Sequence, residues 1–329
     1  MRRTSGLGAA GTAPRGWYGR GVNLPDCLPE SLRGPTTTIT RITTGLSGAG
    51  VYKVDAGGET FVLKISADQE PLELWRRKVE IQERAAAAGV APRVVHADAE
   101  RRAIVSAFVV DRSFIALVVD PRTRADAVVR LGETLRRLHD LPIPDGAQPR
   151  DPRAQLAQMS GALTGFARPA FVDEAIARVL AEPPARDRAP VLSHNDVNPT
   201  NLVFDGERIV LLDWDFAAPN DPLYDLAAAS LFLRFDDATC ARLLAAHDGA
   251  PEAPLPEAFG AQRRLIGVLC GTIFLRLAYM SGHAGAATVD APPSLADVYA
   301  ELRTGALTVA TADGKWAMGL ALVRAGTAG

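Results

Sequence analysis

The chain has 329 residues, of which 47% are hydrophobic and 22% are charged, a balance that is typical of globular proteins and argues against a disordered chain. Its 36 Lys and Arg residues nearly balance 38 Asp and Glu residues, giving a net charge of −2. There is therefore no excess of positive charge to bind nucleic acid or an anionic membrane. The three cysteines are odd in number and far apart, which disfavours a disulfide framework or a zinc cluster.

The first 35 residues are rich in Gly, Pro and Arg and show no periodicity, so we predict that residues 1–35 are a flexible leader. They contain no apolar segment of the kind found in a secretion signal, and we expect a cytoplasmic protein.

Residues 36–110 are predicted to form a small β-rich lobe, because short runs of β-branched and aromatic residues alternate with turn residues. The pair Gly57 and Gly58 lies where a hairpin turn is expected. Within this lobe we predict strands over residues 36–42, 51–56, 59–65, 91–98 and 103–110, and one helix over residues 71–88.

Residues 111–329 are predicted to form a larger helical lobe, since apolar residues recur there at helical spacing. Short apolar runs between residues 190 and 216 predict a β-hairpin inserted between helices. The two lobes together predict an α+β fold. We predict helices over residues 125–140, 168–181, 222–233, 237–246, 256–281 and 293–311, and a proline-rich loop over residues 142–153.

The densest polar cluster is the run SHNDVNPTN at residues 193–201. An Asx-rich turn between strands would explain it without any chemistry. However, Asp196 precedes Asn201 by five residues, and Asp213 ends the next apolar run. Asn and Asp oxygens are ligands that Mg²⁺ prefers, and an Asp outside the metal shell can accept a hydroxyl proton. The spacing H-x-D-x-x-x-x-N with a later Asp matches the template for phosphoryl transfer.

The phosphoryl-transfer template requires two further features that precede this cluster in the chain. It needs a flexible loop whose amides cover phosphates, and TGLSGAGVY at residues 44–52 has three glycines and the hydroxyl of Ser47. It also needs a lysine on the third strand, where Lys64 lies. Alone, each feature has a simpler explanation: hairpin loops are often Gly-rich, and an edge lysine protects a sheet. Their order and spacing together favour a nucleotide site.

The sequence resembles the aminoglycoside phosphotransferase and choline kinase superfamily of protein-kinase-like enzymes that phosphorylate small molecules. Its H-N-D, D-W-D and D-P-x-x-D-L-A motifs are more similar to those of the choline, ethanolamine and thiamine kinase branch than to those of the antibiotic-resistance branch. The resemblance implies a two-lobed protein-kinase-like fold. It is carried by GLSGAGVY (45–52), Leu63 and Lys64, AGVAPRVV (88–95), LRRLHDLP (135–142), HNDVNPTN (194–201) and LLDWDFAAPNDPLYDLA (211–227).

This resemblance implies a role for each matching residue. Asp196 would be the catalytic base, and Asn201 and Asp213 would bind Mg²⁺. Lys64 would hold the α and β phosphates of ATP. The other residues at the nucleotide would be Ser47, Gly48 and Gly50, which would cover the β and γ phosphates, and Ser106 and Phe108, whose backbone groups would pair with adenine.

The sequence departs from the family pattern at one position. Kinases pair the strand lysine with a helix glutamate, and the family register places that residue near Lys78. Residues 73, 77 and 80 share a helix face on which Lys78 does not lie. We therefore expect Glu80 to pair with Lys64, with Glu73 as the alternative.

Other polar residues near the cluster are expected to be structural. The family pattern gives His194 the role of supporting the loop by hydrogen bonds, rather than of a general base. Asp225 is expected to tie the loop to a helix, and His139 is interpreted as a helix-end residue.

The function predicted is an ATP- and Mg²⁺-dependent transfer of phosphate to a hydroxyl of a small polar molecule. A choline- or ethanolamine-like acceptor, or thiamine, is favoured over an aminoglycoside. A nucleotide-binding pseudokinase that regulates a partner is the alternative from another class. No nucleic acid or membrane partner is expected, and the oligomeric state and the choice of ATP or GTP are left open. An aromatic cage would suit a quaternary nitrogen, but most candidates are spaced as core residues: Trp214, Phe232, Phe235, Phe274, Tyr279, Tyr299 and Trp316.

Overall fold

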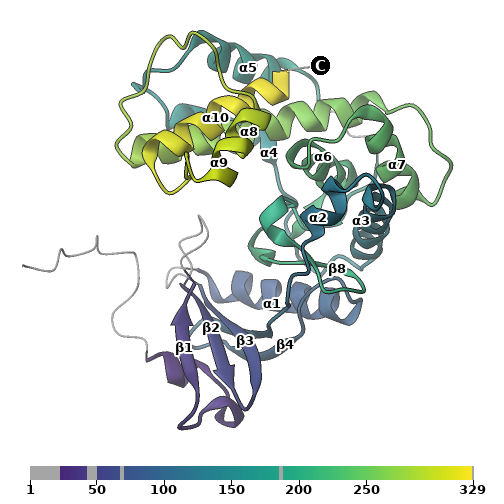
Figure 1. Cartoon of the computed structure of the whole chain (residues 1–329), viewed down its shortest axis with the longest axis vertical. Coiled ribbons are helices and arrows are strands. Elements are labelled where there is room, and N and C mark those ends of the chain that lie inside the picture. The colour runs from purple at the N-terminus through teal and green to yellow at the C-terminus, as the bar shows by residue number, and fades with distance from the viewer. Residues whose placement is uncertain (1–22, 43–49, 67–69, 185–187, 328–329) are drawn as a thin grey trace, which may run out of the picture. The chain divides into compact units, whose positions relative to one another are not determined.

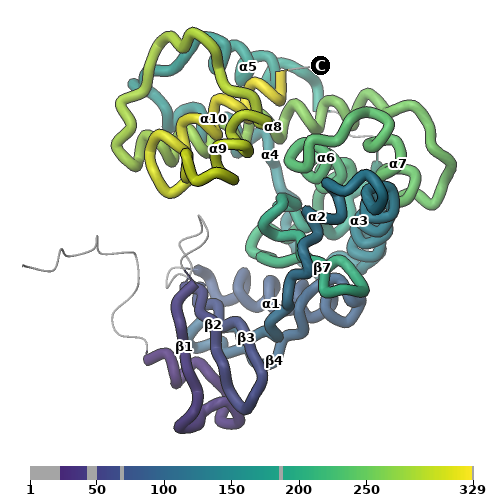
Figure 2. Tube along the Cα trace, viewed as in Figure 1, coloured from purple at the N-terminus to yellow at the C-terminus, as the bar shows by residue number. Residues whose placement is uncertain are grey.

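The structure is a computed structural model that describes residues 23–42, 50–66, 70–184 and 188–327. The chain divides into two compact units (Figures 1 and 2). One unit comprises residues up to Glu80 together with Arg93–Phe108, and the other comprises Ile81–Pro92 together with the chain from Val109 onward. The first is built on a sheet and the second is mainly helical, which confirms the predicted α+β fold.

A five-stranded antiparallel sheet forms the first unit, with the strand order β1-β2-β3-β5-β4. Gly57 and Gly58 form the turn between β2 and β3 with φ angles of 61° and 83°, as expected for a two-residue hairpin turn. The strands are β1 (Thr38–Arg41), β2 (Gly50–Ala56), β3 (Glu59–Ile65), β4 (Val94–Asp98) and β5 (Ala103–Ala107).

Different segments of the chain pack against the two faces of this sheet. Phe61 and Leu63 of β3 pack on one face with Cys27 and Leu28, which belong to the segment with the 3₁₀ turns Leu24–Cys27 and Glu30–Leu32. The described part of the segment predicted as a leader is therefore packed against the sheet, whereas residues 1–22 lie outside the described residues.

Helix α1 (Leu72–Ala87) follows the prediction for residues 71–88 closely. Its Trp75 and Val79 pack with Ile104 of β5. Because directly paired residues lie on the same face of a sheet, and Lys64 pairs with Ile104, Lys64 lies on the face that this part of α1 covers.

The second unit contains nine helices and four short strands within the described residues. Its main core combines α3, α6, α7 and part of α8 with the strands. The helices are α2 (Phe114–Val119), α3 (Arg124–His139), α4 (Pro152–Gly161), α5 (Ala170–Ala181), α6 (Pro222–Phe232), α7 (Asp237–Asp248), α8 (Glu257–Met280), α9 (Leu295–Thr304) and α10 (Ala312–Thr327). The strands form two antiparallel pairs, β6 (Val191–Ser193) with β9 (Ala218–Asn220), and β7 (Leu202–Phe204) with β8 (Ile209–Leu211).

The predicted helices are found with small shifts, and the hairpin β7–β8 is the predicted insertion. Three helices were not predicted: α2, α4 and α10. The predicted helix over residues 293–311 ends at Thr304, because Gly305 follows it in the left-handed conformation that stops a helix.

Helix α8 is the central packing element of this unit, and it lies along α10 (Figure 1). Among the described residues it is the one helix long and apolar enough to cross a membrane, but 56% of that stretch is buried within the protein. Glycines bring α8 and α10 into backbone contact: a Cβ on Gly271 would lie 2.6 Å from Val323 Cγ2 and 2.8 Å from the Gly319 carbonyl oxygen.

We therefore expect Gly271→Ala to destabilise the protein by about 1–3 kcal/mol, the usual cost of overpacking, although alanine favours the helical state. Gly260→Ala is the matched control on the same helix, since its Cβ would meet only the Arg264 side chain, at 3.6 Å. This control should stabilise the helix by up to about 1 kcal/mol. Urea unfolding measures both changes, and equal effects of the two variants would contradict the interpretation.

Candidate active site

The loop that carries Asp196 is held by one buried carboxylate. Asp225 of α6 is fully buried. Its Oδ2 accepts the backbone N–H of His194 at 2.7 Å, and its Oδ1 accepts that of Asn195 at 2.8 Å. Asp225 therefore ties the loop to the first turn of α6, which confirms its predicted structural role.

Asp225 is held as an anion. Burial by itself would raise the pKa of Asp225, but the hydrogen bond and charge of His139, together with the charge and N–H of His194, outweigh burial and keep the pKa below its ordinary value. His139 Nε2 lies 3.1 Å from Asp225 Oδ2. The C-terminal end of α3 therefore also takes part in fixing the loop.

Asn195 bridges the loop to the segment that follows β8. Its φ of 64° is in the left-handed region, where asparagine is better tolerated than most residues. The side-chain amide donates to the carbonyls of Phe216 and Ala218, both at 3.0 Å. Its Oδ1 accepts the amide of Asn220 at 2.7 Å. These contacts fix the backbone directly before Asp196.

Two amides orient the carboxylate of Asp196. Asn201 Nδ2 donates to Asp196 Oδ2 at 2.8 Å, and Asn198 Nδ2 donates to Oδ1 at 3.0 Å. Asn198 also caps the 3₁₀ turn Pro199–Asn201 by accepting the N–H of Thr200. The structure thus brings Asp196 and Asn201 into direct contact.

Burial raises the pKa of Asp196, and the negative charge of Asp213 adds to this rise, while the charge of His194 and the two amide hydrogen bonds oppose it. A carboxylate with a raised pKa is a better proton acceptor at neutral pH. Asp196 therefore has the environment expected of a general base.

Asp213 approaches the loop from β8. The preceding residue, Leu212, donates its N–H to the Asn201 carbonyl at 2.9 Å and accepts a hydrogen bond from the His194 ring at 2.9 Å. The His194 ring also packs on Trp214, with ring centroids 4.9 Å apart. His194 thus supports the loop by hydrogen bonding, as predicted. Asp213 itself has a φ of 62°, which sharply turns the chain at this point.

The residues predicted to bind Mg²⁺ fit that ion. Both hydrogen bonds that the structure shows for the Asn201 side chain use its amide nitrogen, so its amide oxygen points away from Asp196. Asp213 adds a carboxylate. The described residues contain no group of three or more His, Cys, Asp or Glu side chains placed to hold a metal. One or two protein oxygens are the usual share for Mg²⁺ bound with nucleotide phosphates.

The sheet unit carries the residues predicted to bind nucleotide. Lys64 is half-buried on β3. Glu80 follows Val79, the α1 residue that packs on the same face of the sheet as Lys64. Glu73, the alternative partner, is exposed and forms an ion pair with Arg76 at 3.0 Å. Lys78, at the register where the family pattern expects glutamate, pairs with Glu70.

The other predicted nucleotide residues are only partly described. Ser47 and Gly48 lie outside the described residues, and Gly50 is the buried first residue of β2. Ser106 lies within β5. Phe108 donates its N–H to the Thr60 carbonyl at 3.1 Å, so a contact of its backbone with adenine would have to use its carbonyl.

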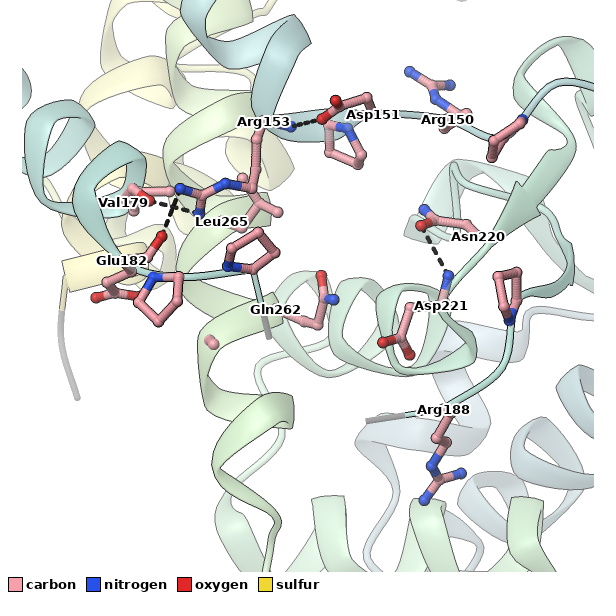
Figure 3. A pocket seen from close by; sticks show the side chains of 16 residues that line it. Arg150, Asp151, Arg153, Val179, Glu182, Arg188, Asn220, Asp221, Gln262 and Leu265 are labelled. Atoms are coloured by element: carbon pink, nitrogen blue, oxygen red, sulfur yellow. Dashed lines mark hydrogen bonds between the residues drawn. The ribbon is translucent and has the colours of Figure 1, made fainter. Parts of the chain in front are cut away.

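A pocket of about 200 Å³ lies in the helical unit (Figure 3). It is lined by residues from the start of α4, the end of α5, residues 182–184, residues 188 and 190, the start of α6, and α8, including Arg150, Asp151, Arg188, Asn220 and Gln262. Asn220 connects its wall to Asn195 of the loop. Asp196, Asn201 and Asp213 do not line this pocket.

Sequence reasoning missed Asn195 and Asn220 as loop-fixing residues and interpreted His139 only as a helix end. No local pattern marks these roles, since the partners are 25 and 86 residues apart in the chain. The one available signal was the density of Asn and Asp residues between 193 and 225.

The family model described as "Phosphotransferase enzyme family" matches residues 38–261. No curated protein matches the chain significantly.

Three solved structures illustrate the similarity in fold. A choline/ethanolamine kinase family protein from Mesorhizobium loti is 22% identical, with a TM-score of 0.58 over 91% of this chain and 96% of that one. Choline kinase LicA from Streptococcus pneumoniae is 14% identical, with a TM-score of 0.59 over 74% of this chain and 86% of that one. An aminoglycoside-3'-phosphotransferase of type VIII is 22% identical, with a TM-score of 0.53 over 72% of this chain and 94% of that one.

Because Asp225 is ionised, the effect of removing its carboxylate on the free energy of unfolding should depend on pH. Because its pKa is lower in the folded than in the unfolded chain, its charge stabilises the fold fully above the unfolded value of 3.8, and this contribution is lost as the pH falls through the lower folded value. Asp225→Asn should lower the free energy of unfolding at pH 7 by about 1.5–3 kcal/mol, as expected for hydrogen bonds to a charged group. Denaturant unfolding of both proteins measures the difference, which should narrow in acid below pH 3.8. A difference that stays constant from pH 7 to acid would contradict this account.

Proposed function

Since the chain belongs to the phosphotransferase enzyme family and is a small-molecule kinase, we propose that it transfers the γ-phosphate of ATP to a hydroxyl group of choline, ethanolamine or a related amino alcohol, with thiamine as a further acceptor of this kind. The observation that carries the proposal is the loop of Asp196, in which two amides orient a buried carboxylate beside Asn201. The H-N-D and D-P-x-x-D-L-A motifs favour amino alcohols, whereas the fold is shared with choline and ethanolamine kinases and with an aminoglycoside phosphotransferase alike.

In the proposed reaction the acceptor oxygen attacks the γ-phosphorus in line with the bond to the departing ADP oxygen. As the new P–O bond forms, Asp196 Oδ accepts the hydroxyl proton, and the electron pair of the broken bond leaves with ADP. The raised pKa of Asp196 suits this step. The hydrogen bonds from Asn198 and Asn201 hold the carboxylate in one orientation, which lowers the entropic cost of reaching the transition state.

Asn201 and Asp213 would hold Mg²⁺, which would supply positive charge to the phosphates when bound. Lys64 would hold the α and β phosphates, with Glu80 fixing its head. Ser47, Gly48 and Gly50 would cover the β and γ phosphates, and Ser106 and Phe108 would contact adenine. As part of this proposal the enzyme acts in the cytoplasm, where its three free cysteines would stay reduced.

The aromatic side chains considered for a choline cage differ in their surroundings. Trp214 and Phe235 are in the core, and Phe232, Phe274 and Tyr299 are partly buried against it. Tyr279 and Trp316 both pack on Phe166. A cage for a quaternary ammonium would therefore draw on the partly buried set rather than on Trp214.

An acceptor panel tests the proposed function. ADP release from Mg²⁺-ATP should rise with choline, ethanolamine or a related amino alcohol, and less with thiamine and with aminoglycosides. A thermal-shift titration with Mg²⁺-ATP runs in parallel, because a ligand that binds only the folded form raises the melting temperature. Turnover with aminoglycosides alone would overturn the proposed acceptor. Nucleotide binding without turnover on any acceptor would favour a regulatory pseudokinase.

Two substitutions separate the proposed base from the proposed metal ligand. Asp196→Ala should lower turnover by about 10²–10⁴-fold, the usual share of general base catalysis, while the thermal shift with Mg²⁺-ATP stays close to wild type. Asp213→Ala should instead reduce the Mg²⁺-dependent part of that shift. Asp205→Ala, in the β7–β8 turn where the carboxylate pairs with Arg208, is the control and should change neither. Wild-type turnover in Asp196→Ala would exclude the base role.

A further inference from the structure

A chain of hydrogen bonds continues from Asp225 across two buried histidines. His139 ends α3, and His247 lies near the end of α7, which packs beside α3 (Figure 1). Both rings are more than nine-tenths buried. His139 Nδ1 lies 2.8 Å from His247 Nε2.

The chain then reaches the surface. His247 Nδ1 lies 2.7 Å from Asp248 Oδ1. Arg188 binds both oxygens of Asp248, at 2.6 and 2.7 Å. Arg188 lies on the wall of the pocket in Figure 3. An unbroken series of side chains thus joins this wall to the backbone of His194 and Asn195, beside Asp196.

The close approach of α3 and α7 fixes this pairing in place. A Cβ on Gly132 of α3 would lie 2.7 Å from the carbonyl oxygen of Leu243 and 3.0 Å from the backbone nitrogen of His247. The two helix backbones are therefore in contact about two turns before His139 and along the turn of α7 that leads into His247. The rings are held with centroids 5.0 Å apart and an interplanar angle of 66°.

The partners of the two carboxylates determine their charge. Asp225 accepts two backbone N–H groups and the His139 ring, and Asp248 accepts the Arg188 guanidinium and the His247 ring. The backbone N–H groups and the guanidinium can only donate. Burial would raise the pKa of both carboxyls, but their hydrogen bonds and the nearby positive charges outweigh burial and keep the pKa of each below its ordinary value. Both carboxylates are therefore ionised, and each takes an N–H from a histidine: Nε2–H of His139 and Nδ1–H of His247.

Two neutral rings would carry too few protons for this series of hydrogen bonds. A neutral imidazole carries one N–H, and both are already used toward Asp225 and Asp248. The contact between His139 Nδ1 and His247 Nε2 would then join two lone pairs at 2.8 Å, which is repulsive. A hydrogen bond there needs one more proton. That proton also places a positive charge beside the fully buried carboxylate of Asp225.

We propose that His139 and His247 share one extra proton at neutral pH, and that His247 is a positioning residue for phosphoryl transfer. It keeps His139 charged against Asp225, and Asp225 in turn holds the loop of Asp196. The role in turnover rests on the proposed function of Asp196, whereas the shared proton does not.

Burial and the neighbouring His139 lower the pKa of His247. The titratable and charged groups that face this pair come from each adjoining element: Asp225 on α6, His194 on the loop, Asp248 on α7 and Arg188 in the segment before β6.

Nuclear magnetic resonance of protein labelled with ¹⁵N-histidine counts the protons on the two rings and needs no phosphate-accepting substrate. At pH 7.5, about one unit above the ordinary pKa of histidine, three of the four ring nitrogens of the pair should be protonated. His96, on β4, is a reference ring outside the pair. Only two protonated nitrogens in the pair would overturn the proposal.

Two substitutions at His247 test the positioning role. In His247→Gln the amide oxygen can take the place of Nε2 and accept from His139, whereas His247→Leu fills the space without an acceptor. Turnover with the acceptor found by the panel should fall about tenfold or more in the Leu variant and be restored to within about threefold by Gln, with KM for ATP unchanged. The alkaline limb of the kcat profile should move to lower pH in the Leu variant only.

Equal losses in the two variants, or an alkaline limb that stays in place, would show that His247 acts only as packing. If the panel identifies no acceptor, the nitrogen count still decides whether the shared proton exists. Failure of the proposed function and failure of this inference are thus distinguishable.

Discussion

A single buried carboxylate holds the candidate active site together. Asp225 accepts the N–H groups of His194 and Asn195, and these two residues lead directly into Asp196. Since two adjacent backbone donors converge on the two oxygens of one side chain, the loop backbone is fixed in both position and rotation. The amides of Asn198 and Asn201, which orient the carboxylate of Asp196, depend on that fixed backbone.

Much of the sheet unit could be predicted from the sequence, because alternating residues such as Phe61, Leu63 and Ile65 mark a half-buried strand directly. The helix α10 could not. Its glycines, Gly314, Gly319 and Gly326, weaken a helical pattern. The reason for Gly319 and Gly326 is visible only in the partner helix α8, whereas Gly314 lies against the carbonyl of Thr308. The helix α4 was hidden by Pro152 at its first turn, a position where proline is well tolerated.

The candidate site likewise contains residues that could be predicted from the sequence and residues that could not. Asp196, Asn201 and Asp213 could be proposed from spacing, since the phosphoryl-transfer template prescribes residue types at set intervals. The supporting contacts could not, because Asn220, His139 and His247 reach the loop through tertiary packing rather than through any local pattern. Sequence spacing identifies the residues that would contact a ligand. The residues that position those side chains are specified by tertiary packing.

The glycine contacts between α8 and α10 also restrict how the C-terminal part of the chain can change. Gly267 faces Gly326, and Gly271 faces Gly319 and Val323, so the two helices fit in one axial alignment. Inserting a residue within either helix would rotate every later side chain of that helix by about 100°. A bulky side chain would then replace a glycine in the contact between α8 and α10. Length variation between homologous chains should therefore be confined to the connections around α9, outside both helices.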